Sequence, residues 1–235
     1  MPGIASEWID ARRQGITVPQ WRSAQRASLD LLPSLGLIRN GLVLDLGANV
    51  GDWTAAVLAT DPSVTIVAVE PGQEPRADLQ ARFASDPRVT INASAVGAAT
   101  GVRTFYVTEH SHNASLKAPR AEMDLLYGHG WRSKQTVEVD VTTVDAISAG
   151  RDVALLKVDV QGAEQEVLDG ARETLPRTTA IILEVTFISH YQGDATFPTL
   201  HEYMGQAGFE LAGLSKVFLS QRRTALWCDA CYTRI

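Results

Sequence analysis

Acidic residues and glycines placed around two apolar runs form the most informative pattern in this sequence. Asp45 lies in the first run, Gly47 and Gly51 follow it, and Glu70 comes directly after the second run. A chain that turns sharply after a strand and passes close to a ligand needs glycine, because a side chain would block the approach. An acid at the end of the next strand can accept hydrogen bonds from both hydroxyls of a ribose. The pattern therefore predicts a site for a cofactor that contains a nucleoside.

Asn49, which lies between the two glycines, indicates the kind of cofactor. The dinucleotide fingerprint GxGxxG has a glycine at this position, so that the backbone can approach a pyrophosphate. S-adenosylmethionine (SAM) has no phosphate but carries a carboxylate and an ammonium group, which a polar side chain suits better. The helix after Gly51 offers free N–H groups to a carboxylate, and Asp45 can hold either the turn or the ammonium group. We expect SAM, with a nicotinamide cofactor as the alternative.

Three residues near the ends of later strands could act as the base in a methyl transfer. The sulfonium methyl of SAM is already activated, so the enzyme aligns the acceptor and, for a hydroxyl, takes up the proton. Asp159 follows one predicted strand, Glu184 lies near the end of the next, and His190 lies in the loop after it. Ligands bind at these strand ends in open α/β sheets.

Each of these candidates has an alternative role. Histidine titrates near neutrality and suits a base, but His190 could equally be an ordinary residue of a surface loop. Asp159 could instead contact SAM or cap a helix. Asp159 and Glu184 together could bind Mg²⁺ through their oxygens, and the metal would lower the pKa of the acceptor hydroxyl. We favour a reaction without a metal over this alternative.

Two segments are expected to form the wall of an acceptor pocket. The polar loop 109–120 contains His110, His112, Asn113 and Ser115, and the segment 127–131 contains Tyr127, His129 and Trp131. The two closely spaced histidines of the loop could bind a metal, but a solvated loop is the favoured interpretation. Trp21, Tyr127 and Trp131 could stack on a flat or sugar-like acceptor, or pack within a lid.

Strands and helices must alternate along the chain to position these residues. Apolar runs predict strands, and segments of helical periodicity predict the helices between them. The predicted strands are 42–46, 64–69, 89–92, 135–141, 153–158 and 179–185, with short strand-like pieces over 95–107 and a closing hairpin of 209–214 and 225–233. The predicted helices are 52–60, 73–85, 163–171 and 197–207, with a short one beginning at 142–145. This alternation predicts a mainly parallel sheet covered by helices on both faces.

Length and charge limit the class of protein. The 235 residues suit one α/β domain at 41–235, preceded by an N-terminal helical extension or lid at 1–40. A net charge of −6 argues against a large basic face for nucleic acid. No apolar run reaches the roughly 18 residues that span a bilayer, and the N-terminus lacks a secretory pattern. We therefore expect a cytoplasmic protein without nucleic-acid or membrane partners; its oligomeric state stays open, a homodimer included.

The two cysteines, Cys228 and Cys231, have the spacing of a redox pair or half a zinc site. The sequence has no second pair to complete a zinc site. The segment is also typical of a terminal strand, on which residues three apart face opposite sides of the sheet. We therefore expect buried, unreactive thiols.

Five runs of this sequence resemble the FkbM family of SAM-dependent methyltransferases, over about residues 40–190. They are VLDLGANVGDW (43–53), VAVEP (67–71), NASAVG (92–97), LLKVDVQGAEQEVLDGA (155–171) and ILEV (182–185). The block KxDxxGxE, from Lys157 to Glu164, is the most specific of these. The resemblance implies the class I methyltransferase fold: a doubly wound, mostly parallel, seven-stranded sheet with an antiparallel last strand.

The resemblance also implies roles for individual residues. Gly47, Asn49 and Gly51 would line the methionine and ribose of SAM, and Glu70 would bind the ribose hydroxyls. Asn92, Ser94 and Ala95 would border the adenine, and Asp159 would lie by the methionine end and the acceptor. The implied activity is O-methylation of a small-molecule hydroxyl on a sugar or natural product. The alternatives are a nicotinamide-dependent oxidoreductase and a SAM-binding module without activity.

Overall fold

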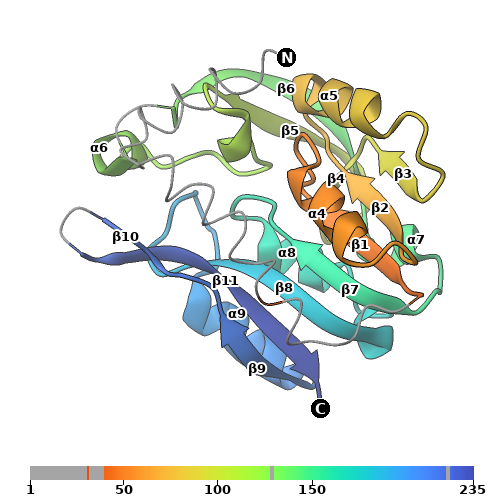
Figure 1. Cartoon of the computed structure of the whole chain (residues 1–235). Helices are drawn as coiled ribbons and strands as arrows, with labels where there is room; N and C mark the ends of the chain where they lie inside the picture. The colour runs from red at the N-terminus through yellow and green to blue at the C-terminus, as the bar shows by residue number, and fades with distance from the viewer. Residues whose placement is uncertain (1–30, 32–39, 128–129, 221–222) are drawn as a thin grey trace.

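The computed structural model describes residue 31 and residues 40–127, 130–220 and 223–235. These residues form a large sheet and a smaller, three-stranded one (Figure 1). The helices predicted for residues 1–40, together with Trp21 and His129, lie outside the described residues.

Five parallel strands form the centre of the large sheet, in the order β3-β2-β1-β7-β8. Their bounds are β1 Leu42–Leu46, β2 Thr65–Val69, β3 Val89–Asn92, β7 Val153–Val158 and β8 Thr178–Thr186. Strands that are covered on both faces read as continuous apolar runs. This explains why the sequence predicted them to within two residues at each end.

An antiparallel strand, β11 (Ala225–Arg234), closes the sheet. It pairs with β8 along one edge, and with β9 (Phe209–Leu214) and β10 (Phe218–Leu219) along the other. The predicted hairpin and antiparallel last strand are confirmed. The predicted number of seven strands is too low, because β10 makes this an eight-stranded sheet among the described residues. Two residues are too few to show a strand's alternation in the sequence.

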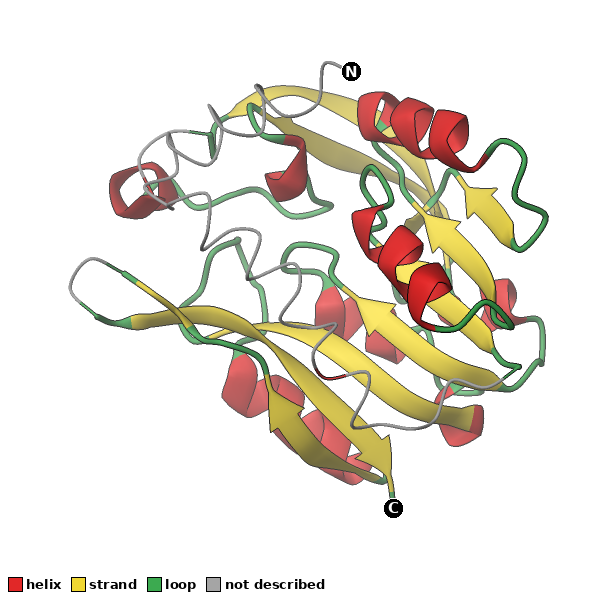
Figure 2. Cartoon of the chain, in the orientation of Figure 1, coloured by secondary structure: helices red, strands yellow, loops and turns green. Residues whose placement is uncertain are grey.

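Helices cover both faces of the large sheet, as Figure 2 shows. The helices α4 (Asp52–Thr60) and α5 (Gln73–Phe83) pack on one face. The other face carries α7 (Val144–Ser148), α8 (Glu164–Asp169) and α9 (Phe197–Gln206), and the 3₁₀ turn η3 (Leu175–Arg177). The doubly wound fold is therefore confirmed. No helix of the described ranges has the length and apolar character needed to cross a membrane.

The small sheet is inserted between β3 and β7. It consists of β4 (Ala95–Val96), β5 (Gly101–Thr108) and β6 (Ser133–Thr142), in the order β4-β6-β5. The connection from β5 to β6 carries the 3₁₀ turn η2 (Ser111–Asn113) and the short helix α6 (Met123–Tyr127). This insertion carries the polar loop that the sequence singled out.

The cysteines of β11 are buried in two different cores. Cys228 packs in the core on the side of α7, α8 and α9, whereas Cys231 packs in the core on the side of α4 and α5. Neither forms a disulfide. Burial raises the thiol pKa of Cys228 to about 12 and that of Cys231 to about 11. The prediction that both thiols are buried is confirmed, and their raised pKa values favour low reactivity.

Candidate functional site

The turn after β1 contains three residues of left-handed backbone. Gly47, Asn49 and Gly51 have φ values of +80°, +48° and +82°. A Cβ at Gly47 would lie 1.8 Å from the carbonyl oxygen of Asp159, and one at Gly51 would lie 2.6 Å from Leu79 Cδ1. Glycine is therefore required here by the protein's own packing against the end of β7 and against α5, in addition to any approach of a ligand.

Glu70 joins this turn to the start of α5. Its two carboxylate oxygens accept hydrogen bonds from the backbone N–H groups of Asn49 (2.9 Å) and Gly72 (2.7 Å). Burial raises the pKa of Glu70 to about 7, against the opposite effect of these hydrogen bonds. A carboxylate oxygen can accept a second hydrogen bond. Glu70 can thus hold the turn and still accept bonds from a ribose diol.

The residues predicted to border the adenine lie between the end of β3 and the start of β4, next to Glu70. The carbonyl of Asn92 accepts a hydrogen bond from the Glu70 N–H (3.0 Å), and its side-chain oxygen accepts one from the Ser94 N–H (2.8 Å). Asn92 therefore shapes the turn that leads into β4. The side chain of Ala95 is buried in the core of the small sheet with Phe105, so only its backbone could border a ligand.

Five charged residues lie in a row on one face of the large sheet, across the neighbouring strands β1, β7, β8 and β11. Asp45 pairs in register with Lys157, and Glu184 pairs in register with Asp229. Asp159 lies two residues after Lys157, and alternate residues of a strand share a face. We call Asp45, Lys157, Asp159, Glu184 and Asp229 the charged row. No local feature of the sequence distinguishes Asp229 from other acids, so sequence reasoning missed it.

Lys157 holds one end of the charged row together. Its ammonium lies 3.2 Å from Asp45 Oδ1 and 3.4 Å from Asp159 Oδ2, and it donates to the Gly47 carbonyl (3.3 Å). Burial lowers its pKa, but the two carboxylates outweigh burial and raise it overall. Asp45 also accepts a hydrogen bond from the Thr54 hydroxyl (2.6 Å) and is fully buried. Of the two roles expected for Asp45, this geometry favours holding the turn.

At the other end of the charged row, the acids Asp159, Glu184 and Asp229 outnumber Lys157, the cation of the row. Burial, and then the charge of Asp159, raise the pKa of Glu184 well above its ordinary value. The same two causes raise the pKa of Asp229 to about 7. Two neighbouring acids with raised pKa values bind a cation or a proton more tightly than ordinary acids do. Within residue 31 and residues 40–127, 130–220 and 223–235, no group of three or more His, Cys, Asp or Glu side chains is arranged to hold a metal ion.

Gln161 connects this acidic end to the neighbouring loops. Its amide nitrogen donates to Asp159 Oδ1 and to Glu184 Oε2, both at 2.8 Å. Its amide oxygen accepts from the Tyr191 hydroxyl (2.8 Å), and its backbone carbonyl accepts from the Ser115 hydroxyl (2.6 Å). Sequence reasoning missed Gln161, although it lies inside the KxDxxGxE block, because the block does not specify this position.

His190 lies in an aromatic cluster and not on the surface, so the interpretation as an ordinary surface residue is wrong. The side chain is 3% exposed, and Nε2 lies 2.8 Å from the Tyr127 hydroxyl. Its ring centroid is 5.5 Å from that of Trp131. Burial lowers the pKa of His190 to about 4. The imidazole is therefore neutral at pH 7 and is a weaker base than an ordinary histidine.

The polar loop 109–120 lies across the same end of the sheet. The Asn49 side-chain amide donates to the Ser111 hydroxyl (3.4 Å). The single hydrogen of the Tyr191 hydroxyl is shared between Gln161 Oε1, at 2.8 Å, and the more distant Asn113 carbonyl, at 3.1 Å. Pro119 forms a β-bridge with Tyr191. The loop thus contacts the glycine turn at one end and the loop after β8 at the other, as a wall of an acceptor pocket would.

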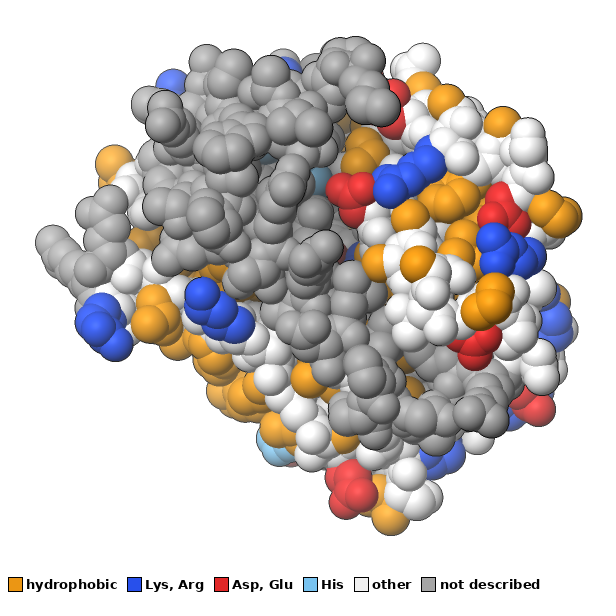
Figure 3. All heavy atoms as spheres, in the orientation of Figure 1, with side chains coloured by type: hydrophobic (Ala, Val, Ile, Leu, Met, Phe, Trp, Pro, Cys, Tyr) orange, Lys and Arg blue, Asp and Glu red, His pale blue; other side chains and the backbone are white. Residues whose placement is uncertain are grey.

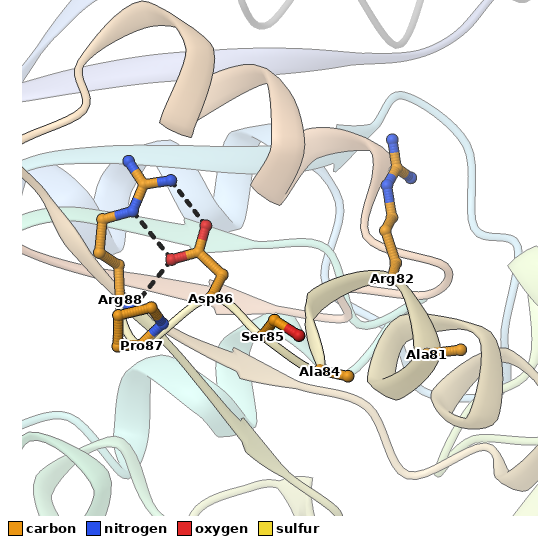
Figure 4. Close-up of a pocket in the computed structure, with 7 residues that line it drawn as sticks. All are labelled: Ala81, Arg82, Ala84, Ser85, Asp86, Pro87 and Arg88. Atoms are coloured by element: carbon orange, nitrogen blue, oxygen red, sulfur yellow. Dashed lines mark hydrogen bonds and ion pairs between the residues drawn. The ribbon is translucent and has the colours of Figure 1, made fainter.

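A shallow pocket lies at the end of α5 and is lined by residues 81–88 without residue 83; Figure 4 shows its Asp86 and Arg88 bonded to each other. None of the predicted site residues lines it. On the face in Figure 3, acidic and basic side chains alternate among the residues that are not drawn in grey.

A model of the methyltransferase FkbM domain matches residues 45–211. The chain is 29% identical over 169 residues to 31-O-demethyl-FK506 methyltransferase FkbM of Streptomyces tacrolimicus, covering 61% of this chain and 65% of that protein. It is 27% identical over 165 residues to 2-O-methyltransferase NoeI of Sinorhizobium fredii, covering 65% of this chain and 66% of that protein. The chain thus matches just under two thirds of the length of these curated relatives.

The fold also matches a solved structure. A crystal structure of methyltransferase FkbM from Methylobacillus flagellatus aligns with a TM-score of 0.56 at 18% identity, covering 84% of this chain and 45% of that chain. At this identity the match concerns the fold alone. It agrees with the class I methyltransferase fold expected from the sequence.

Proposed function

Because the chain belongs to the FkbM methyltransferase family, we propose that it transfers a methyl group from SAM to a hydroxyl oxygen of a small molecule. The names of both curated relatives describe methylation at oxygen. The family resemblance of the sequence favours a hydroxyl of a sugar or of another natural product as the acceptor. SAM is the methyl donor that the family implies.

The observation that carries this proposal is the acidic end of the charged row, beside a glycine turn and a ribose-binding acid. Asp159 directly follows β7, Glu184 lies near the end of β8, and Asp229 lies opposite Glu184 on β11, with Lys157 as the cation of the row. The sulfonium and ammonium groups of SAM are cations, and they are stabilised where buried carboxylates are in excess. A dinucleotide would instead bring a pyrophosphate, which these carboxylates would repel. The charge of the site thus supports SAM over a nicotinamide cofactor.

When bound, SAM supplies a methyl group that is already activated by its positive sulfur. The task of the protein is to orient the acceptor and to take the proton of its hydroxyl. Glu70 accepts hydrogen bonds from the ribose, and the loop 109–120 excludes water from the acceptor side. Glu184, helped by Asp159, takes the proton, because its raised pKa makes it a stronger base than an ordinary carboxylate. His190, with its pKa of about 4, orients Tyr127 in the wall of the pocket.

The proposal is tested with SAM that carries an isotopically labelled methyl group. The chain is incubated with a panel of sugars, glycosides and polyketides that have free hydroxyls, and products are identified by mass spectrometry. We expect the label on an oxygen of one acceptor class, and a loss of about 100-fold or more in kcat for Glu184→Gln.

Two results would contradict the proposal. Tight SAM binding in calorimetry without transfer to any acceptor of the panel would favour a binding module. Thermal stabilisation by a nicotinamide cofactor, but not by SAM, would favour an oxidoreductase.

A further inference from the structure

The amide of Gln161 bridges two carboxylates that would otherwise repel each other. Both of its N–H groups are used, one on Asp159 and one on Glu184, at 2.8 Å each. Hydrogen bonds to an ionised carboxylate are stronger than those between neutral groups. The bridge therefore sets the separation of the two acids and favours their ionised forms.

The surroundings of Gln161 fix which way the amide faces. The Tyr191 hydroxyl donates to its oxygen, so the nitrogen must face the carboxylates. Its backbone has φ +60°, a left-handed conformation that is unfavourable for a residue with a side chain. Ser115 holds its carbonyl, and the ring of Tyr191 fills the space beside Gly162. An unfavourable backbone that is held by several contacts is typical of functional positions.

We propose that Gln161 is a positioning residue for methyl transfer, whose amide holds Asp159 and Glu184 at one separation and keeps them ready to accept the proton of the acceptor. This inference rests on the function proposed above. It adds a residue that acts through the two acids without touching the reacting atoms. It also links the acids to the acceptor side, because Ser115 and Tyr191 belong to the loops that form its wall.

The ionisation of the acids depends on every charged group around them. These groups are Asp45 on β1, Lys157 on β7, Asp159 directly after β7, Glu184 on β8, Asp229 on β11, Glu164 at the start of α8, and the phenols of Tyr127 and Tyr191. The Gln161 amide donates to Glu184 and favours its ionised form, so loss of this donor raises the pKa of Glu184 further. Turnover requires the ionised acid. As the pH falls, a chain without the amide of Gln161 must therefore lose turnover at a higher pH than the unmodified chain does.

Gln161→Met tests the inference, because it keeps the length of the side chain and removes both donors. We expect the acidic limb of the kcat–pH profile to move upward by about one pH unit per hydrogen bond lost, with unchanged calorimetric affinity for SAM. Tyr191→Phe, which frees the amide to rotate, should move the limb in the same direction by less. Gln206→Met is the matched control, because Gln206 bonds only to exposed Glu202 on α9 in the described structure; its profile should not move.

A second measurement needs no turnover. The side-chain carboxyl carbon of Glu184 is followed by ¹³C NMR as a function of pH, in the unmodified chain and in Gln161→Met. A midpoint that moves upward supports the inference. An unchanged midpoint and an unchanged kcat profile would overturn it, even if Gln161→Met melts at a lower temperature. Absence of methyl transfer by the unmodified chain would count against the proposed function instead.

Discussion

At the scale of single residues, Glu70 combines an observed structural role with a proposed role in binding ribose. It holds the glycine turn through Asn49 and the start of α5 through Gly72, and it remains able to accept hydrogen bonds from a ribose. The sequence predicted its position directly after a parallel strand. Its structural role was not predicted, because its partners are backbone groups that the fold brings to it.

Glu70→Ala should weaken SAM binding by about 1–3 kcal/mol, since hydroxyls of the ribose lose their acceptor. Isothermal titration calorimetry measures this directly. Glu74 is an exposed acid in the first turn of α5. Glu74→Ala is therefore the matched control and should bind SAM normally. Equal affinities of the unmodified chain and Glu70→Ala would remove Glu70 from the cofactor site.

His190→Gln distinguishes a wall residue from a base. We expect a higher KM for the acceptor and a kcat lowered by less than about tenfold, because the imidazole of a wall residue does not move the proton. A base contributes about 10²–10⁴-fold to the rate. A collapse of kcat by that factor with SAM affinity intact would make His190, and not Glu184, the base. Steady-state kinetics on the identified acceptor decides between them.

At the scale of elements, the turn between β1 and α4 depends on its neighbours. Gly47 faces the carbonyl of Asp159 at the end of β7, and the Asp159 N–H donates to the carbonyl of Leu46 (3.1 Å). The two strand ends are thus packed backbone against backbone. This brings Asp159 and the glycine turn together, although they lie far apart in the sequence.

Gly47→Ala and Gly150→Ala form a matched pair that separates steric clash from backbone strain. Both glycines have nearly the same positive φ, +80° and +77°, but a Cβ at Gly150 meets nothing within 4 Å. Gly150→Ala should therefore cost only the roughly 1–2 kcal/mol of a left-handed residue. Gly47→Ala should cost clearly more, because the end of β7 must move. Urea unfolding followed by circular dichroism compares the two, and equal losses would show that the turn yields easily.

At the scale of the whole molecule, buried acids make stability depend on pH. Burial raises the pKa of Glu70 and of Glu164 from 4.5 to about 7, and that of Asp229 from 3.8 to about 7. Each group binds its proton more tightly in the folded chain than in the unfolded one. Its contribution to stability is complete below the unfolded pKa, about 4 for a carboxyl group, and is lost as the pH rises through about 7.

The chain without cofactor should therefore melt at a higher temperature at pH 6 than at pH 8. Asp229→Asn removes one of these titrations, so its melting temperature should differ less between the two pH values than that of the unmodified chain. Differential scanning calorimetry measures both, and Asp140→Asn, on the exposed part of β6, serves as control. An Asp229→Asn chain with the full pH dependence would show that Asp229 ionises normally.

The sequence by itself determined most of the elements and singled out the residues that we propose for the cofactor half of the site. Apolar runs, glycines and the acid after β2 are local features, and a strand or a tight turn depends mainly on such features. The bounds of β1, α4, β3, β7 and β9 were therefore predicted to the residue. The sequence also indicated membership of the FkbM family, because the family's motifs are short local runs.

Only the tertiary structure decided how the second half of the site is arranged. The charged row exists because β1, β7, β8 and β11 are neighbours in space, and the pairing of distant strands is a property of the whole sheet. The tertiary structure placed Asp229 and Gln161 beside Asp159 and Glu184. It also buried His190 among aromatic rings, which lowered its pKa. A side chain's proton affinity depends on what surrounds it, and those surroundings arrive from segments far away in the sequence.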